Sequence, residues 1–363
     1  MRRFLRKIFL RPVLWATRKF ASRPDRARVF ESLDKLSAAI LAEPGKKGLV
    51  LPLNPAAGYI IFSDQHKGAR DGADDFTLAE PCYLAALEHY NTSGFSFISL
   101  GDSEELWENT LGQVKKYNER TFEAEKKFQQ RNSFYKVLGN HDLYWGNDPL
   151  ASWELKKIYG EDVKIYEGLI LEMYNPEGLL QVFCTHGHQG DRQSDGNWFS
   201  KFFVARIWAP FQAYLRINPN TAAYDTEKKT LHNEIMYEWS STRRDMVLIT
   251  GHTHQPVFAS LTHIERLYKE LQKAQIDKNQ QHITEIETEI RKREKEFTAV
   301  SVDYQVMQPS YFNSGCCCYV DGDITGIEME GGYIRLVKWS QRSGQPMRSV
   351  LEEMKLSDLQ LQL

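Results

Sequence analysis

The chain has 363 residues, of which 42% are hydrophobic and 26% are charged. These ordinary values exclude a collagen-like, low-complexity or wholly disordered protein. The formal net charge of −2 hides an uneven distribution, because residues 1–28 contain ten Lys or Arg and a single acid. A basic arm on an acidic body favours an anionic partner for the arm alone, not for the whole surface.

Residues 1–48 are predicted to form a basic amphipathic N-terminal arm. Within it, residues 2–20 have the pattern of a short helix that Pro12 would kink. Such a helix can lie in a membrane interface, so residues 1–24 are predicted to contact an anionic membrane surface. The alternative is an arm that packs on its own domain or on RNA. The sequence shows no cleavable signal and no apolar run of about 18 residues, which predicts a cytoplasmic protein, at most peripheral on a membrane.

From residue 58 onward, short apolar strands alternate with helices. This order predicts an α/β sandwich with its functional loops at the carboxyl ends of the strands. The predicted strands are 58–63, 95–100, 134–138, 179–185 and 246–250, and the predicted helices are 76–90 and 112–131.

Two insertions are predicted to interrupt this core. Residues 192–242 are rich in aromatic residues and are predicted to form a helical lid; a small satellite core that closes on the main domain is the alternative. Residues 262–297 are highly charged but carry two narrow apolar seams, which predict a helical hairpin. After the hairpin, 311–320, 323–330 and 333–339 are predicted as further strands, and 346–363 as a C-terminal tail.

The five cysteines predict free thiols. Cys316, Cys317 and Cys318 are consecutive in an apolar, strand-like stretch, and Cys82 and Cys184 stand alone. No Cys-x-x-Cys pair offers a zinc site, so buried thiols in a reducing compartment are the simplest interpretation.

Five short clusters of polar residues each follow an apolar strand. Residues i and i+2 of an extended chain face the same way, so each Asp-x-His or His-x-His pair projects two side chains together. Flanking glycines allow sharp turns where side chains must converge. The donors are nitrogen and oxygen, which suits Mn, Fe or Zn. The clusters are Asp64 with His66, Gly101 with Asp102, Gly139 with Asn140, His141 and Asp142, His186 with Gly187, and Gly251 with His252 and His254.

This ordered set resembles the calcineurin-like metallophosphoesterase family over roughly residues 58–258. The resemblance implies a four-layer α-β-β-α sandwich for residues 49–345. It also implies two divalent metal ions, Mn by preference with Fe or Zn as alternatives. Asp64, His66 and His254 would bind one metal and Asn140, His186 and His252 the other, with Asp102 bridging the two.

The expected mechanism follows from charge. Two divalent ions about 3.5–4 Å apart can share a water and turn it into a hydroxide nucleophile. By the same resemblance His141 would be the general acid for the departing oxygen, with Asp142 orienting its ring; a structural role is the alternative for both. Lys67 and Arg70 are predicted to bind a second phosphate or a carboxylate of the substrate, or else to be solvated loop cations.

The substrate is predicted to be a small or lipid-linked phosphoester. Glu105 and Trp107 extend the second cluster to Gly-Asp-x-x-Glu-x-Trp, which is similar to the UDP-2,3-diacylglucosamine pyrophosphohydrolases, enzymes that work at the membrane face with a helical lid. That subfamily usually carries Arg where this chain has His141. A serine/threonine protein phosphatase and a non-catalytic scaffold are the alternative interpretations. The loops between residues 64 and 254 contain few basic residues, which argues against a nucleic-acid substrate.

Overall fold

The computed structural model describes residues 24–54, 58–71, 74–107, 109–176, 178–190, 226–293 and 307–363. The helix expected at residues 2–20 and most of the expected lid lie outside these ranges. None of the described helices is long and apolar enough to cross a membrane.

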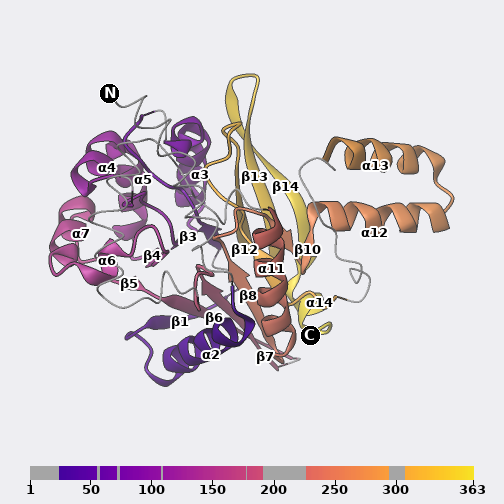
Figure 1. Ribbon diagram of the computed structural model, residues 1–363, viewed down its shortest axis with the longest axis horizontal. Coiled ribbons are helices and arrows are strands. Elements are labelled where there is room, and N and C mark those ends of the chain that lie inside the picture. Colours follow the sequence, from indigo (N-terminus) through magenta and orange to yellow (C-terminus); the bar gives the residue numbers. More distant parts are fainter. Residues whose placement is uncertain are drawn as a thin grey trace, which may run out of the picture.

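The described residues form two seven-stranded sheets at the centre of the molecule (Figure 1). The first has the order β1-β6-β7-β8-β11-β9-β10 and the second the order β14-β13-β12-β2-β3-β4-β5. The strands of the first sheet are β1 (Gly48–Pro52), β6 (Gly168–Asn175), β7 (Gly178–Thr185), β8 (Met246–Thr250), β11 (Tyr311–Asn313), β9 (Val257–Phe258) and β10 (Leu261–Thr262). Those of the second are β14 (Gln345–Lys355), β13 (Tyr333–Arg342), β12 (Ile324–Glu330), β2 (Tyr59–Phe62), β3 (Ser96–Leu100), β4 (Phe134–Val137) and β5 (Ile165–Tyr166).

Helices cover the outer face of each sheet and complete a four-layer α-β-β-α sandwich, as the sequence predicts. One core, which includes Ile61, Val182 and Phe312, fills the space between the sheets. The second sheet is covered by α3 (Glu80–Thr92), α5 (Glu119–Gln129) and α7 (Ala151–Tyr159), and the first by α2 (Arg26–Ala42) and α11 (Thr226–Ser241). The remaining helices of the core are η1 (Asp75–Leu78), α4 (Leu111–Tyr117), α6 (Tyr144–Asn147) and α14 (Leu356–Gln360).

The N-terminal boundary at residue 48 is wrong, because the folded core already begins at α2. Val29, Leu33, Leu36 and Ile40 recur at helical spacing and are buried against the first sheet. Asp25 caps the helix by accepting a hydrogen bond from the Arg28 backbone N–H. This apolar stripe directly follows the basic residues of the arm, so the folded helix and the basic segment adjoin in the sequence.

The predicted C-terminal tail at 346–363 is also wrong. Residues 345–355 form the edge strand β14, which pairs antiparallel with β13, and α14 buries Leu356 and Leu359 against the central core. An edge strand has one partner and a solvated face, so its charged residues resemble those of an unstructured tail.

Two further predictions change in detail, and the prediction for the cysteines is confirmed. Residues 112–131 form two helices, because the buried Asn118 side chain donates to the carbonyl oxygens of Gly68 and Val114 and interrupts the run. The strand expected at 311–320 ends at Asn313, so the three consecutive cysteines lie in the loop that follows. All five cysteines are free and buried.

The part of the predicted lid that the structure describes belongs to the sandwich. Residues 226–241 form α11, whose Ile235, Met236 and Trp239 are buried against the first sheet. Trp239 Nε1 donates to Asp34 Oδ1 on the neighbouring α2 at 2.8 Å. The aromatic residues of 192–225 lie outside the described ranges.

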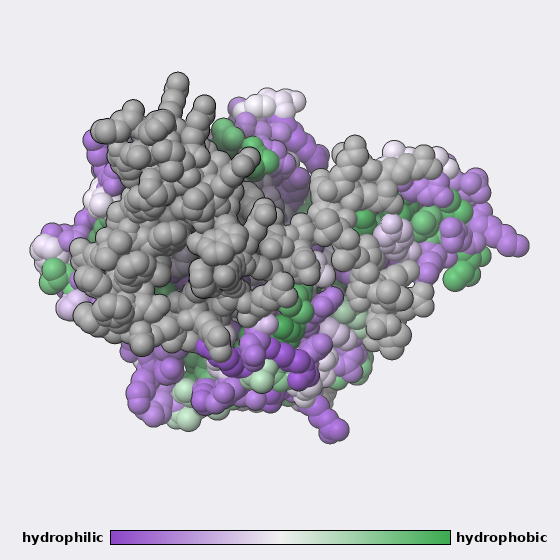
Figure 2. All heavy atoms as spheres, in the orientation of Figure 1, coloured by the Kyte–Doolittle hydropathy of each residue, from purple (hydrophilic) through white to green (hydrophobic). Residues whose placement is uncertain are grey.

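The charged insertion contains two packed helices, α12 (His263–Ile276) and α13 (Gln280–Arg293), which project away from the sandwich (Figure 1). Leu267, Ala274, Ile286 and Ile290 form its internal apolar seam. At the base of the hairpin, Arg266 Nε lies 2.6 Å from Glu352 Oε1 of β14, and this ion pair links the hairpin to the second sheet. The described surface around the hairpin is largely hydrophilic, with scattered hydrophobic residues (Figure 2).

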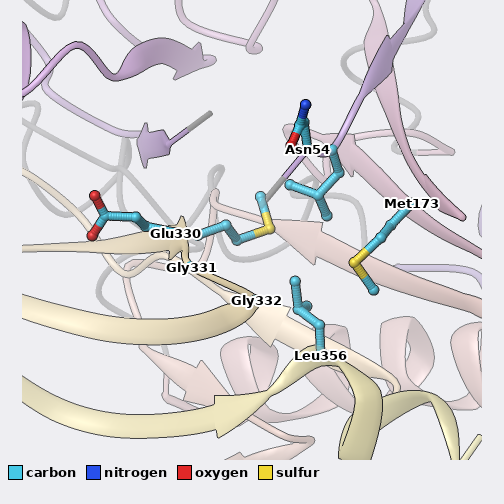
Figure 3. A pocket seen from close by; sticks show the side chains of 8 residues that line it. Asn54, Met173, Glu330, Gly331, Gly332 and Leu356 are labelled. Carbon is cyan, nitrogen blue, oxygen red and sulfur yellow. The ribbon is translucent and has the colours of Figure 1, made fainter. Parts of the chain in front are cut away.

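A small hollow lies between the layers, and Asn54, Met173, Glu330 and Leu356 are among the residues that line it (Figure 3). Neighbouring Met329 pairs with Tyr59 at the start of β2, whereas the first polar cluster follows the end of that strand. The hollow is therefore at the opposite end of the sheets from the polar clusters.

Candidate metal centre

The five predicted clusters meet at one rim of the sandwich. Asp64, Asp102 and Asn140 follow the parallel strands β2, β3 and β4 of the second sheet. His186 and His252 follow the parallel strands β7 and β8 of the first sheet. Because parallel neighbours end at the same edge, each strand delivers its polar residues to a shared site between the sheets.

One half of the site contains Asp64, His66 and His254. His254 Nε2 lies 3.2 Å from Asp64 Oδ1 and 3.3 Å from His66 Nε2. Asp64 is fully buried. Burial would raise the pKa of its carboxyl group, but the neighbouring imidazoles of His254 and His186 hold that pKa well below its usual range.

The other half contains Asn140, His186 and His252. His186 Nε2 lies 3.3 Å from Asn140 Oδ1, and the rings of His186 and His252 have centroids 5.2 Å apart. The Leu100 carbonyl oxygen lies 2.9 Å from His186 Nδ1 and accepts its proton, which directs the Nε2 lone pair into the site.

Asp102 lies between the two halves. Its Oδ2 is 3.1 Å from His186 Nε2 and 3.9 Å from His66 Nε2. Potential ligand atoms within 4.8 Å of one another link Asp64, His66 and Asp102 in one group, and Asp102, His186 and His252 in another. The same carboxylate therefore belongs to both groups.

The unsatisfied polar atoms of this site fit bound cations. Within the described part of the chain, no hydrogen bond reaches the buried Asp64 Oδ1. Glu105 accepts the Nδ1 proton of His66, so the Nε2 atom of the neutral ring presents a lone pair to the site. Buried acceptors without hydrogen-bond donors are costly alone and are suited to metal coordination.

The backbone at these residues adopts the uncommon left-handed conformation. Asp64, His66, Asp102, His252 and His254 all have φ between 49° and 70°. Such residues each cost on the order of 1 kcal/mol and persist where surrounding contacts hold them, often at functional sites. Gly139 has a different role: a Cβ there would lie 2.1 Å from Asp102 Oδ1, so only glycine leaves space for this carboxylate.

Glu105 orients two histidines of the site, and Asp142 does not take the predicted role. Glu105 Oε2 lies 2.8 Å from His66 Nδ1, and its Oε1 lies 2.9 Å from His141 Nδ1. Burial would raise the pKa of Glu105, but the two imidazoles lower it to about 2. Asp142 instead accepts hydrogen bonds from the backbone N–H groups of Ser103 and Gly139.

The side chain of Trp107 stacks on His141. Their ring centroids are 4.3 Å apart, with an angle of 18° between the planes. Burial would lower the pKa of His141, but Glu105 and Asp102 raise it above the usual value. Both Glu105 and Trp107 were visible in the sequence as the extension of the Gly-Asp cluster, although not with these contacts.

Lys67 and Arg70 do not have the surroundings predicted for substrate ligands. Lys67 is fully buried, and its Nζ lies 2.6 Å from Glu125 Oε1 and 3.1 Å from Glu104 Oε1. Arg70 pairs with Glu80 at 2.5 Å and donates to the Tyr117 carbonyl. Both cations are thus engaged by the protein itself, and we assign them structural roles.

Sequence reasoning missed two contacts of the site. His232, on α11, has its ring centroid 5.1 Å from that of His252, and burial lowers the pKa of His232 to about 4. Cys318 Sγ lies 3.6 Å from His254 Nδ1. Neither residue is part of a recognisable motif; only the topology brings them to the rim.

A family model described as calcineurin-like phosphoesterase matches residues 60–256. The chain belongs to this family. It is therefore a metallophosphoesterase, a hydrolase that acts on phosphoesters, and this family uses divalent metals. No curated protein sequence matches the chain.

Several solved structures are similar at low identity. Vacuolar protein sorting 29 from Cryptosporidium parvum is 11% identical, with 83% of this chain and 100% of that chain covered and a TM-score of 0.31. A predicted phosphoesterase from Streptococcus pneumoniae is 10% identical, with 81% and 97% covered and a TM-score of 0.27. A dimetal phosphatase from Danio rerio is 7% identical, with 82% and 100% covered and a TM-score of 0.34.

Proposed function

We propose that this metallophosphoesterase is a binuclear metal-dependent hydrolase. Asp64, His66 and His254 would hold one cation, and Asn140, His186 and His252 would hold the second. The observation that carries the proposal is the position of Asp102, whose Oδ2 approaches a histidine of each half. A single buried carboxylate in that position can bridge two cations. The nitrogen and oxygen donors support manganese, with iron or zinc as alternatives.

When bound, two divalent cations supply an activated water and neutralise charge on the phosphoryl oxygens. The protein supplies the remaining chemistry. Glu105 accepts the Nδ1 proton of His141, so Nε2 is the nitrogen that would give a proton to the departing oxygen. The Trp107 ring stacks on one face of the imidazole and so restricts the orientation of the His141 ring. A fixed, protonated imidazole can act as the general acid.

Replacing His141 by alanine tests this role. We expect turnover of esters with poor, alkoxide-like leaving groups to fall by about 10²- to 10⁴-fold, because those groups need a proton as the bond breaks. Esters with good leaving groups, such as dinitrophenyl phosphate, should lose much less. Steady-state kinetics of the metal-loaded variant over a leaving-group series measures the difference.

The control is His282→Ala, which changes a partly exposed histidine on the hairpin; this histidine is hydrogen-bonded to Glu270. It should leave the leaving-group dependence unchanged. An equal loss for all esters in His141→Ala would show that His141 positions the substrate or the metals and does not donate the proton.

We propose a small or lipid-linked phosphoester as the substrate. The likeness of this segment to UDP-diacylglucosamine-type pyrophosphohydrolases supports the lipid-linked alternative, and the motif residues Glu105 and Trp107 both lie at the site. A screen of manganese-loaded protein against phosphomonoesters, phosphodiesters, nucleotides, UDP-linked lipids and phosphoserine peptides tests the proposal. Hydrolysis of lipid-linked pyrophosphate would support it, whereas exclusive action on phosphopeptides would favour the protein-phosphatase alternative.

We further propose a cytoplasmic location with peripheral membrane binding through residues 1–24. The support is the basic, amphipathic pattern of that segment and the five free, buried thiols, which suit a reducing compartment.

Deleting residues 1–24 should abolish co-sedimentation with vesicles that contain anionic lipid while leaving turnover of a soluble ester unchanged. The deletion retains Asp25 and therefore the N-cap of α2. Neutral phosphatidylcholine vesicles provide the control. Undiminished binding to anionic vesicles would contradict the proposal.

A further inference from the structure

The loop between β11 and β12, residues 314–323, contacts the half of the metal centre that contains Asp64, His66 and His254. Cys317 N–H donates to the Asp64 carbonyl oxygen at 3.2 Å, and Tyr319 Oη donates to the His254 carbonyl oxygen at 3.1 Å. Ser314 Oγ also lies 2.8 Å from Ser63 Oγ, beside Asp64. One loop therefore contacts the backbone of two residues that adopt the left-handed conformation.

The same loop contacts the His254 ring through sulfur. Cys318 Sγ lies 3.6 Å from His254 Nδ1, within hydrogen-bond reach for sulfur. The opposite nitrogen, Nε2, faces Asp64 Oδ1 and His66 Nε2. Cys318 is buried, so solvent has little access to this contact.

Coordination fixes the direction of the hydrogen bond. A histidine that binds a metal through Nε2 must carry its proton on Nδ1, and that proton needs an acceptor. For His186 the acceptor is the Leu100 carbonyl, and for His66 it is Glu105. Among the contacts of the described residues, a sulfur atom takes the corresponding position beside His254.

We propose that Cys318 is a positioning residue that accepts the Nδ1–H of His254 and so directs Nε2 toward the first metal. This inference rests on the proposed binuclear function. The cysteine run thus has a role beyond that of buried, inert thiols.

The test is the affinity of the full chain for Co²⁺, followed by the visible absorption of the metal and by calorimetry. Cys318→Ala should weaken the first site by about 10- to 100-fold, the usual effect of losing a hydrogen-bond partner of a ligand histidine. Cys318→Ser should restore most of the affinity, because its hydroxyl oxygen can accept the same proton. Cys82→Ala, at a fully buried cysteine in the outer core, is the matched control and should bind as the unaltered protein does.

A second measurement, the proton resonance of His254 Nδ1–H, detects the Cys318 contact even if the metal affinity does not change. In zinc-loaded protein, the exchangeable Nδ1–H proton resonance of His254 should shift between the unaltered chain and Cys318→Ser, and should stay in place in Cys82→Ala. Unchanged Co²⁺ affinity in Cys318→Ala together with an unshifted resonance would overturn the inference. Failure of the unaltered chain to bind any metal would instead overturn the proposed function.

Discussion

Replacing Asp102 by asparagine should reduce metal-dependent turnover by about a thousandfold or more while the protein remains folded. The expected size follows from the several kcal/mol that bridged cations contribute to stabilising transition-state charge. Asp102 is the carboxylate shared by both halves of the site. Asparagine retains an oxygen that can accept the His141 backbone N–H, a bond of 2.8 Å in the unaltered protein, but it removes the bridging charge.

Kinetics and metal content should be measured on the same preparation. The variant should bind fewer than two cations per chain, and its melting temperature without metal should be close to that of the unaltered protein. Asp34→Asn provides a matched control, because Asp34 lies on α2, accepts hydrogen bonds from Trp239 and Arg243, and belongs to none of the candidate ligand groups of the described residues. Full activity in Asp102→Asn would rule out the bridging role.

Replacing Lys67 by methionine should destabilise the fold by about 3–5 kcal/mol, the usual consequence of removing one partner of a buried ion pair. Lys67, Glu104, Glu125 and Lys136 are all fully buried. Lys136 Nζ lies 2.9 Å from Glu104 Oε2, and the hydroxyl groups of Tyr83 and Tyr159 donate to Glu125. Without the Lys67 ammonium, two buried carboxylates face one remaining cation.

Urea unfolding of the metal-free protein measures this change. Lys35→Met, which removes the exposed pair with Glu31, is the matched control and should have little effect. If Lys67→Met lowered the free energy of unfolding as little as Lys35→Met, the cluster of Lys67, Glu104, Glu125 and Lys136 would not stabilise the fold as proposed.

The acid dependence of stability gives an independent check on the same cluster. Burial would raise the pKa of Glu104, but Lys136 and Lys67 lower it from 4.5 to about 2. A carboxyl group with a lowered pKa stabilises the fold fully above 4.5, and this contribution is lost as the pH falls toward 2. In Lys67→Met the pKa of Glu104 should rise, so the loss of stability should begin at a higher pH.

The site could be predicted from the sequence because its residues follow apolar strands. Asp64, Asp102 and His186 each come directly after such a strand, and parallel strands end together. Their partners could not be assigned in the same way. Asp142 is adjacent to His141 in sequence, yet Glu105 holds the imidazole, because the β3 loop approaches it in space.

Lys67 illustrates a second limit. A lysine in a loop beside two metal ligands resembles a substrate ligand, and only the packing of Glu104 and Glu125 around it shows a buried ion pair. The fold was predicted best where apolar strands are continuous. It was missed at α2, whose stripe follows a basic arm, and at β14, whose charges belong to a solvated sheet edge.

The most direct test of the binuclear centre is anomalous diffraction from crystals of the full chain soaked in Mn²⁺. The account predicts two manganese peaks on either side of the Asp102 carboxylate, one beside His66 and His254 and the other beside Asn140 and His186. A single peak, or peaks that Asp102 does not contact, would contradict it.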